Sequence, residues 1–328
     1  MRGMEAVAPS FKKPSIFGIA RCMVWTIFAE RFLESTLTGM AKSGRVDPAQ
    51  QLGAVPLVRD LSNTRWVETQ VLMKGIHNGL NTVYLHSEQS PTPEMFSKVC
   101  LTEMCTSESN GSGEEESGHN GKENTFIFEE FAAPAFAHLK GLHGISSETF
   151  CSSFREGSSF IELTPNSKSR QRFLFTEDGK YMLKSASEDE LESLLCFLPE
   201  FAEHFAHNRG SLISRCYGAY RITDSRTNRS TIYMVFSNVF STSRWVEERY
   251  DLKGSTIGRR ASQTHSEKPT GMMKDLDLED ISGDVNRAQR QLKGLHLGAG
   301  EKQSLMMALR ADTEFLCRLK IMDYSLLV

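Results

Sequence analysis

Apolar residues recur three and four positions apart in several parts of the chain, which is the spacing of a helix with one buried face. We expect helices at residues 65–86, 129–145, 188–206 and 301–319, and Ser146 and Glu148 are typical of a further helix start. The clearest stripe belongs to 188–206, whose first turn is acidic and whose apolar face consists of Leu191, Leu194, Leu195 and Leu198.

Short apolar runs predict strands elsewhere. Arg172–Thr176 and Tyr181–Ser185 flank a Glu-Asp-Gly turn, so we expect a hairpin there. Two more strands are expected at Ser214–Ile222 and Thr231–Phe240, joined by a polar turn. Strands, one helix, more strands and then helices predict an α+β fold.

Two regions lack such periodicity. Residues 1–65 carry no readable motif, and residues 87–124 are rich in Ser, Gly and Glu with little to bury. We therefore expect an amino-terminal extension of unknown role (1–65), a helix (66–86), an acidic disordered linker (87–124) and a folded core (125–328).

One stretch of the extension, Ile16–Leu33, is apolar enough to consider as a membrane segment. Arg21, Glu30 and Arg31 interrupt it, and its longest uninterrupted run is Cys22–Ala29. A spanning helix needs about 20 apolar residues. An amphipathic helix packed on protein is the favoured interpretation, with a helix in a membrane interface or a leader segment as alternatives.

Composition narrows the class of protein further. Of 328 residues, 39% are hydrophobic and 24% are charged, and the net charge is −3. This is globular composition and argues against a wholesale nucleic-acid binder. The seven cysteines are scattered and form no C-x-x-C pair, so reduced thiols in a cytosolic protein are indicated, without a zinc site or a disulfide framework.

Lys184 is the first candidate for chemistry. It lies in a predicted strand directly before the acidic helix, although a lysine in a strand more often faces solvent. In kinases, a strand lysine pairs with a helix glutamate and contacts the nucleotide phosphates. Glu190 and Glu192 are both candidates for the partner, but only one can face the lysine.

The string YDLKGSTIGRRAS, which begins at Tyr250, is the second candidate. Asp251 and Lys253 would share a face of a strand, and Gly254 would let the backbone approach a phosphate. Arg259 and Arg260 add two guanidinium groups suited to phosphate. A plain solvated turn is the alternative interpretation.

The third candidate is Asp323, in the closing string IMDYSLLV. A carboxylate between apolar neighbours needs partners or a task, and an aspartate can deprotonate the attacking hydroxyl in phosphoryl transfer. His204 and His207 lie three apart on a predicted helix without an evident third ligand, so we predict no metal site.

Together these blocks resemble the phosphatidylinositol phosphate kinases. YDLKGSTIGRRAS, KDLDL (Lys274–Leu278) and IMDYSLLV are similar to that family's signature blocks, in the same order. The resemblance extends from about Val71 to Val328, interrupted by the acidic linker, and is looser over the predicted hairpin and the helix that follows it. It implies a two-lobed α+β lipid-kinase fold with an antiparallel sheet in the amino-terminal lobe. The form STIGRRAS is more similar to the type I members, the phosphatidylinositol 4-phosphate 5-kinases, than to the family's large endosomal type.

The resemblance implies roles at the nucleotide, with ATP and Mg²⁺ as cofactors. Lys184 would hold the ATP phosphates, and Glu192, by its distance from the following Leu-Pro pair, would brace it. Ser167, Lys168 and Ser169 would lie in the phosphate loop before the hairpin.

At the lipid, Lys253 would lie near the transferred phosphate with Asp251 supporting it, and Asp323 would be the catalytic aspartate. Arg259 and Arg260 would bind the anionic substrate. The expected partner is a phosphoinositide in a membrane surface, with the protein peripheral at the cytoplasmic face and no nucleic acid involved.

Two departures from the family qualify this expectation. Ser167 and Arg170 stand where the family's phosphate loop has glycines, so side chains could obstruct ATP or Arg170 could supply a charge instead. The family's metal-binding aspartate and activation loop would lie beyond Val328, so we expect a carboxyl-terminally truncated kinase with an incomplete second lobe, inactive alone. A catalytically dead phosphoinositide- or partner-binding module and a soluble inositol phosphate kinase are the alternatives.

Overall fold

The computed structural model describes residues 4–7, 26–28, 55–56, 64–83, 91–106, 124–155, 157–163, 171–242, 246, 248–261, 271–279, 297–322 and 324–328. The chain divides into two compact units. Unit 1 consists of Met1–Lys13, Val55–Ala202 and Cys216–Ser237, and unit 2 consists of Pro14–Ala54, Glu203–Arg215 and Asn238–Val328.

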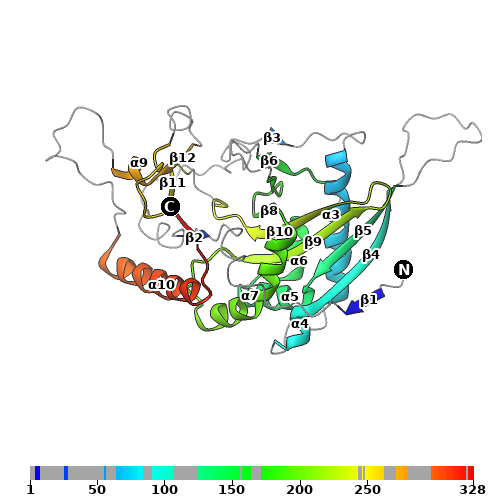
Figure 1. The fold of residues 1–328 in the computed structure, drawn as a ribbon, viewed down its shortest axis with the longest axis horizontal. Helices are drawn as coiled ribbons and strands as arrows, with labels where there is room; N and C mark the ends of the chain where they lie inside the picture. Colours follow the sequence, from blue (N-terminus) through cyan, green and yellow to red (C-terminus); the bar gives the residue numbers. More distant parts are fainter. Residues whose placement is uncertain are drawn as a thin grey trace, which may run out of the picture. The chain divides into compact units, whose positions relative to one another are not determined.

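Unit 1 is built on a nine-stranded sheet in which every neighbouring pair of strands is antiparallel (Figure 1). The strand order is β1-β4-β5-β9-β10-β8-β7-β6-β3. The strands are Met4–Val7 (β1), Val55–Pro56 (β3), Lys98–Thr106 (β4), Asn124–Phe131 (β5), Ile161–Leu163 (β6), Phe173–Phe175 (β7), Tyr181–Ala186 (β8), Cys216–Asp224 (β9) and Arg229–Ser237 (β10).

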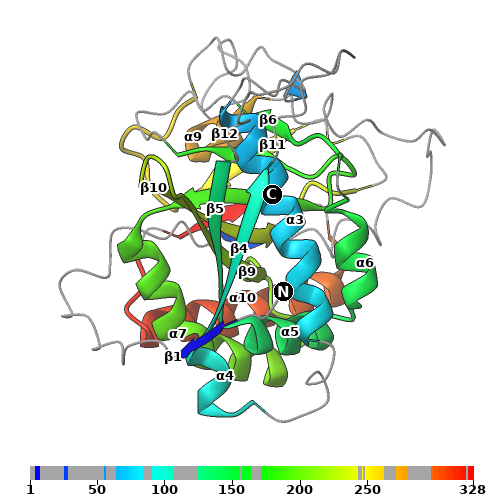
Figure 2. The same ribbon diagram turned by 90° about the vertical axis from the view of Figure 1, so that its right-hand side faces the viewer.

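Three helices lie together over one face of this sheet. Helix α3 lies against β4, β5 and β9 and beside α5 and α6 (Figure 2). Gly75 permits the close approach, because a Cβ there would overlap the ring of Phe128 on β5. The helices are Thr64–Val83 (α3), Pro93–Ser97 (α4), Ala133–Leu142 (α5), Ser147–Ser152 (α6) and Glu188–His207 (α7), the last of which also contributes to unit 2.

The alternation of strand residues decides which face Lys184 occupies. Its neighbours in β8, Tyr181 and Leu183, belong to the apolar core that α3 helps to form. Because successive strand residues point to opposite faces, Lys184 lies on the face away from α3. Its cross-strand partner there is Met234 of β10.

Unit 2 contains a four-stranded sheet in the order β12-β11-β13-β2. Strand β11 is parallel to β12 and antiparallel to β13, and Tyr250 and Val328 exchange two backbone hydrogen bonds of 2.8 and 3.0 Å. The two signature strings at Tyr250 and at the carboxyl end are therefore adjacent strands. The elements are Thr26–Phe28 (β2), Arg249–Leu252 (β11), Met272–Lys274 (β12), Ser325–Leu327 (β13), Asp275–Glu279 (α9) and Ala299–Arg318 (α10).

A buried hydrogen-bond cluster anchors α10 in unit 2. Asp312, which is fully buried, accepts hydrogen bonds from Ser211 Oγ (2.8 Å) and the Leu212 amide (2.7 Å). Its Oδ1 also lies 2.7 Å from Nε2 of His204, whose ring stacks on Phe315. His204 is thus part of a structural network.

The α+β class and the antiparallel sheet of the amino-terminal part are confirmed. Three of the predicted helices, the hairpin and the helix start at Ser146, whose Oγ accepts a hydrogen bond from the Thr149 amide at 3.1 Å, are confirmed as well. The helix predicted at 129–145 is confirmed only for Ala133–Leu142, because residues 129–131 pair with β4 and β9 as the end of β5. The disordered linker predicted at 87–124 is wrong for Pro93–Thr106, which forms α4 and β4 because β4 finds partners on both sides, in β1 and β5. The other predicted domain boundaries stay predictions.

The apolar stretch Ile16–Leu33 falls mostly outside the described residues. Its described part, Thr26–Phe28, is a strand paired with β13 and not the favoured helix. Within the described part of the chain, no helix has both the length and the apolar character needed to cross a bilayer.

Candidate functional site

Lys184 and Glu190 form a buried ion pair in unit 1, with 2.7 Å between Nζ and Oε1. Strand β8 supplies the lysine, and the first turn of α7, which follows directly, supplies the glutamate. Their side chains are only 8% and 4% exposed. Water is nearly excluded, so the carboxylate is the main compensation for the lysine charge.

A capping box explains why Glu190 takes this position. Its amide donates to Ser187 Oγ (3.2 Å), and its Oε2 accepts the Ser187 amide (2.9 Å). Nε2 of Gln171 donates to Oε1 at 3.2 Å. The start of the helix therefore fixes the carboxylate, and the carboxylate fixes the lysine.

The prediction that Glu192 braces Lys184 is wrong. Glu192 is exposed, because residues two apart on a helix point in different directions and Glu190 already faces the strand. The Ser-x-x-Glu pattern that begins at Ser187 is a sequence signal that would have identified Glu190. Ser167, Lys168 and Ser169 lie outside the described residues, and their role stays a prediction.

In unit 2, the carboxylate of Asp275 holds both ends of residues 253–259, the KGSTIGR loop. Oδ1 accepts hydrogen bonds from the backbone amides of Lys253 (2.9 Å) and Gly254 (2.7 Å), and Oδ2 accepts one from Nε of Arg259 (2.7 Å). Partial burial alone would raise the pKa of Asp275, but these hydrogen bonds together lower it below its usual value. The clamp is therefore an ionised carboxylate at neutral pH.

A second aspartate, Asp277, fixes the segment that follows the loop. Its Oδ2 accepts the amides of Ala261 and Lys274, each at 2.9 Å. The KDLDL block is thus a scaffold for the loop, a role that the sequence interpretation did not assign. Two aspartates in the first turn of a helix, which carries unpaired amides, are the signal that was available.

The two arginines of the string occupy different environments. The side chain of Arg259 is 12% exposed and contacts Asp275 and, at 3.4 Å, the carboxylate of Asp251; it also donates to the Asp251 carbonyl. Arg260 is 52% exposed and lies 4.0 Å from Asp277. The structure thus places Arg259 within the scaffold and Arg260 at its surface.

Asp251 does not assemble a metal site with its described neighbours. Its Oδ1 is buried and accepts no hydrogen bond from the residues that the structure describes. Across those residues, no group of three or more His, Cys, Asp or Glu side chains is placed to hold a metal ion. We therefore attach no Mg²⁺ ligand to the described part of this chain.

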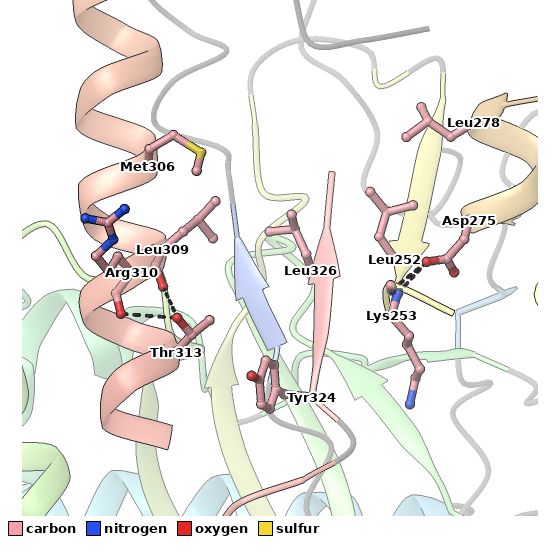
Figure 3. Close-up of a pocket in the computed structure, with 11 residues that line it drawn as sticks. Leu252, Lys253, Asp275, Leu278, Met306, Leu309, Arg310, Thr313, Tyr324 and Leu326 are labelled. Carbon is pink, nitrogen blue, oxygen red and sulfur yellow. Dashed lines mark hydrogen bonds between the residues drawn. The ribbon is translucent and has the colours of Figure 1, made fainter. Parts of the chain in front are cut away.

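The KGSTIGR loop borders an open pocket of about 580 Å³ within unit 2 (Figure 3). The side chain of Lys253 is directed away from Asp275, whose carboxylate bonds its backbone amide. The lining is largely apolar, and its two cationic side chains are those of Lys253 and Arg310. The residues that line the pocket are Leu252, Lys253, Gly254, Asp275, Leu278, Met306, Leu309, Arg310, Thr313, Tyr324 and Leu326.

The pocket brings together two of the strings that the sequence singled out. Leu252, Lys253 and Gly254 come from one string, and Tyr324 and Leu326 come from the other. Asp323 itself lies outside the described residues, so its predicted role is untested.

A strand lysine bonded to a glutamate of the following helix, on an antiparallel sheet, is the arrangement found in the nucleotide lobe of kinases. The chain belongs to the phosphatidylinositol-4-phosphate 5-kinase family, whose model matches residues 155–328.

Three relatives illustrate the similarity. A Dictyostelium discoideum protein named probable phosphatidylinositol phosphate kinase is 35% identical over 208 residues, which is 62% of this chain and 27% of the relative. The phosphatidylinositol 4-phosphate 5-kinase of Plasmodium falciparum is 30% identical over 216 residues (61% and 12%). The human phosphatidylinositol 5-phosphate 4-kinase type-2 beta is 33% identical over 204 residues (62% and 46%). The chain thus matches less than half the length of each of these relatives.

Proposed function

We propose that this chain is part of an ATP-dependent kinase that converts phosphatidylinositol 4-phosphate to the 4,5-bisphosphate. The buried Lys184–Glu190 pair carries the nucleotide part of this proposal, because it presents a fixed ammonium group suited to phosphate oxygens. ATP, entering as its magnesium salt, would supply the phosphoryl group.

The acceptor part of the proposal rests on unit 2. Lys253, at the pocket, is assigned to the transferred phosphate, and Asp323 to orienting and deprotonating the headgroup hydroxyl. Asp251 and Arg259 hold the loop that carries Lys253, and Arg260, which is exposed, contacts the anionic lipid. The protein would act as a peripheral protein at the cytoplasmic face of a membrane.

The 4-phosphate is chosen as substrate because the matching family model and the Plasmodium relative both carry that name. The human relative is named for the 5-phosphate, so the two lipids must be compared directly.

The test is transfer of the γ-phosphate of ATP to vesicles that contain either lipid, with free inositol phosphates as a soluble alternative. It is run with the chain alone, where we expect no transfer, and with the chain joined to the part of the human relative that it does not match. For the joined protein we expect label in the bisphosphate lipid from the 4-phosphate vesicles, and its loss in Lys253→Met but not in Lys302→Met, an exposed lysine of α10. No transfer by the folded joined protein, transfer to the 5-phosphate alone, or transfer only to soluble inositol phosphates would each refute the proposal.

A further inference from the structure

Ile257 is the most exposed large hydrophobic side chain among the described residues, at 91%. A single surface isoleucine needs no explanation by itself. Three features of its surroundings, however, suggest a purpose: its place at the apex of a turn, the clamp beneath that turn, and the distribution of charge around it.

The turn sets Ile257 outward. The Arg259 amide donates to the Thr256 carbonyl, which closes a turn with Ile257 and Gly258 at its centre. Gly258 has φ +69°, the left-handed value that the second central residue of a type II turn requires. Ile257 therefore takes the first central position, at the tip of the KGSTIGR loop.

The clamp anchors both ends of the loop that carries this tip. Asp275 bonds the amides of Lys253 and Gly254 at one end of the loop and the Arg259 side chain at the other. The Leu276 amide also donates to the Arg259 carbonyl at 2.9 Å. An isoleucine held out on an anchored turn loses little conformational freedom when it enters an apolar phase.

The positive and negative side chains of this region differ in exposure. Lys253 and Arg260 are exposed, whereas the side chains of Asp251, Asp275 and Asp277 are 27%, 14% and 13% exposed. The exposed charges of this string are thus cations, and the carboxylates that contact it are the less exposed groups.

We propose that the KGSTIGR loop is a membrane-docking tip, in which Ile257 enters the headgroup–acyl boundary of an anionic bilayer while the adjacent Arg260 contacts lipid phosphates. An apolar tip ringed by hydroxyls and cations matches the layered chemistry of that boundary. A protein partner would need a broader apolar patch, whereas the residues beside Ile257 are Ser255, Thr256 and Gly258. This inference rests on the proposed lipid substrate and adds how the site reaches it.

The test is cosedimentation of the 328-residue chain with phosphatidylcholine vesicles, with and without phosphatidylserine. We expect binding that needs phosphatidylserine, and a partition coefficient about five- to tenfold lower in Ile257→Ser. The matched control is Ile127→Ser, at an isoleucine of β5 that is 39% exposed, which should change binding by less than about twofold.

A second readout reports insertion directly. The fluorescence of Ile257→Trp, corrected for the wild-type signal, should be quenched by lipids brominated on their acyl chains. Absence of vesicle binding by the wild-type chain, unchanged binding by Ile257→Ser, or a bound but unquenched Ile257→Trp would each overturn the proposal, the last two in favour of a protein contact at this tip. ATP binding does not require insertion, so its absence would instead count against the proposed function.

Discussion

At the scale of single residues, the Lys184–Glu190 pair is the most consequential contact of unit 1. Both side chains are buried, so removing one partner leaves a charge without compensation. We expect Glu190→Gln to lower the free energy of unfolding by about 3 kcal/mol, as measured by urea denaturation.

Two further variants make that prediction specific. Glu192→Gln, two residues along the same helix and exposed, should change stability by less than about 0.5 kcal/mol. The double variant Lys184→Met/Glu190→Gln should recover most of the loss, because it leaves no buried charge. Equal effects of Glu190→Gln and Glu192→Gln would contradict the assigned pairing.

A second buried pair, outside the candidate site, ties stability to pH. Burial raises the pKa of Glu130 on β5 from about 4.5 to about 7, partly offset by Lys140. Burial lowers the pKa of Lys140 on α5 from 10.5 to about 8, partly offset by Glu130. The ammonium group of Lys140 lies 4.2 Å from the centre of the Phe150 ring, and Glu130 abuts α3 at Gly79.

The sign of the pH dependence follows from which state binds the proton more tightly. Between about pH 4.5 and 7, folded Glu130 retains a proton that the unfolded chain has lost, so raising the pH lowers the free energy of unfolding, by on the order of 3 kcal/mol. Glu130→Gln should abolish this slope in denaturation curves taken across the window. A slope that persists in the variant would show that another group titrates there.

The choice between Glu190 and Glu192 shows how much of the ion pair could be predicted from sequence patterns. The sequence predicted a lysine–glutamate pair at the right strand and helix. The predicted glutamate was wrong because the prediction rested on the distance to the following Leu-Pro pair. The capping box at Ser187 decides which glutamate of the helix faces the strand. The Ser-x-x-Glu capping pattern therefore predicts the partner of Lys184 better than the distance to the Leu-Pro pair does.

At the scale of elements, the two aspartates of α9 bind different segments: Asp275 binds the KGSTIGR loop, and Asp277 binds the residues that flank it. Asp275→Ala should speed amide hydrogen exchange at Lys253 and Gly254 by about tenfold or more, because both amides lose their acceptor. Asp277→Ala should do the same at Ala261 and Lys274.

Each aspartate variant serves as the control for the other. The exchange rates at Lys253 and Gly254 should stay unchanged in Asp277→Ala, and those at Ala261 and Lys274 should stay unchanged in Asp275→Ala. Uniform loss of protection in both variants would mean that the loop and its flank open as one unit, against the division described here.

Elements with a strong local signal were predictable, and elements that depend on distant partners were not. Helix α7 combines an acidic first turn with an apolar stripe, and both features are readable in sequence. Strand β4 lies in an acidic, glycine-rich neighbourhood and owes its order to β1 and β5. Similarly, the scaffold role of KDLDL arises because strand pairing brings Asp275 beside Lys253 and Gly254.

At the scale of the whole molecule, the family and the α+β class were accessible because three signature strings occur in one order. The order of the nine strands in unit 1 could not be predicted, because it depends on pairing between segments that are far apart in the sequence. The chain matches less than half the length of each of the three relatives described above, so the activity of the whole protein is a proposal built on two separately described units.

We propose that unit 1 binds the phosphates of ATP through Lys184. The most direct measurement is calorimetric titration of Mg·ATP into the chain and into Lys184→Met, with circular dichroism to confirm that both are folded. We predict saturable binding by the chain and at least about tenfold weaker binding by the variant. Equal affinities, or no binding by the folded wild-type chain, would contradict the account.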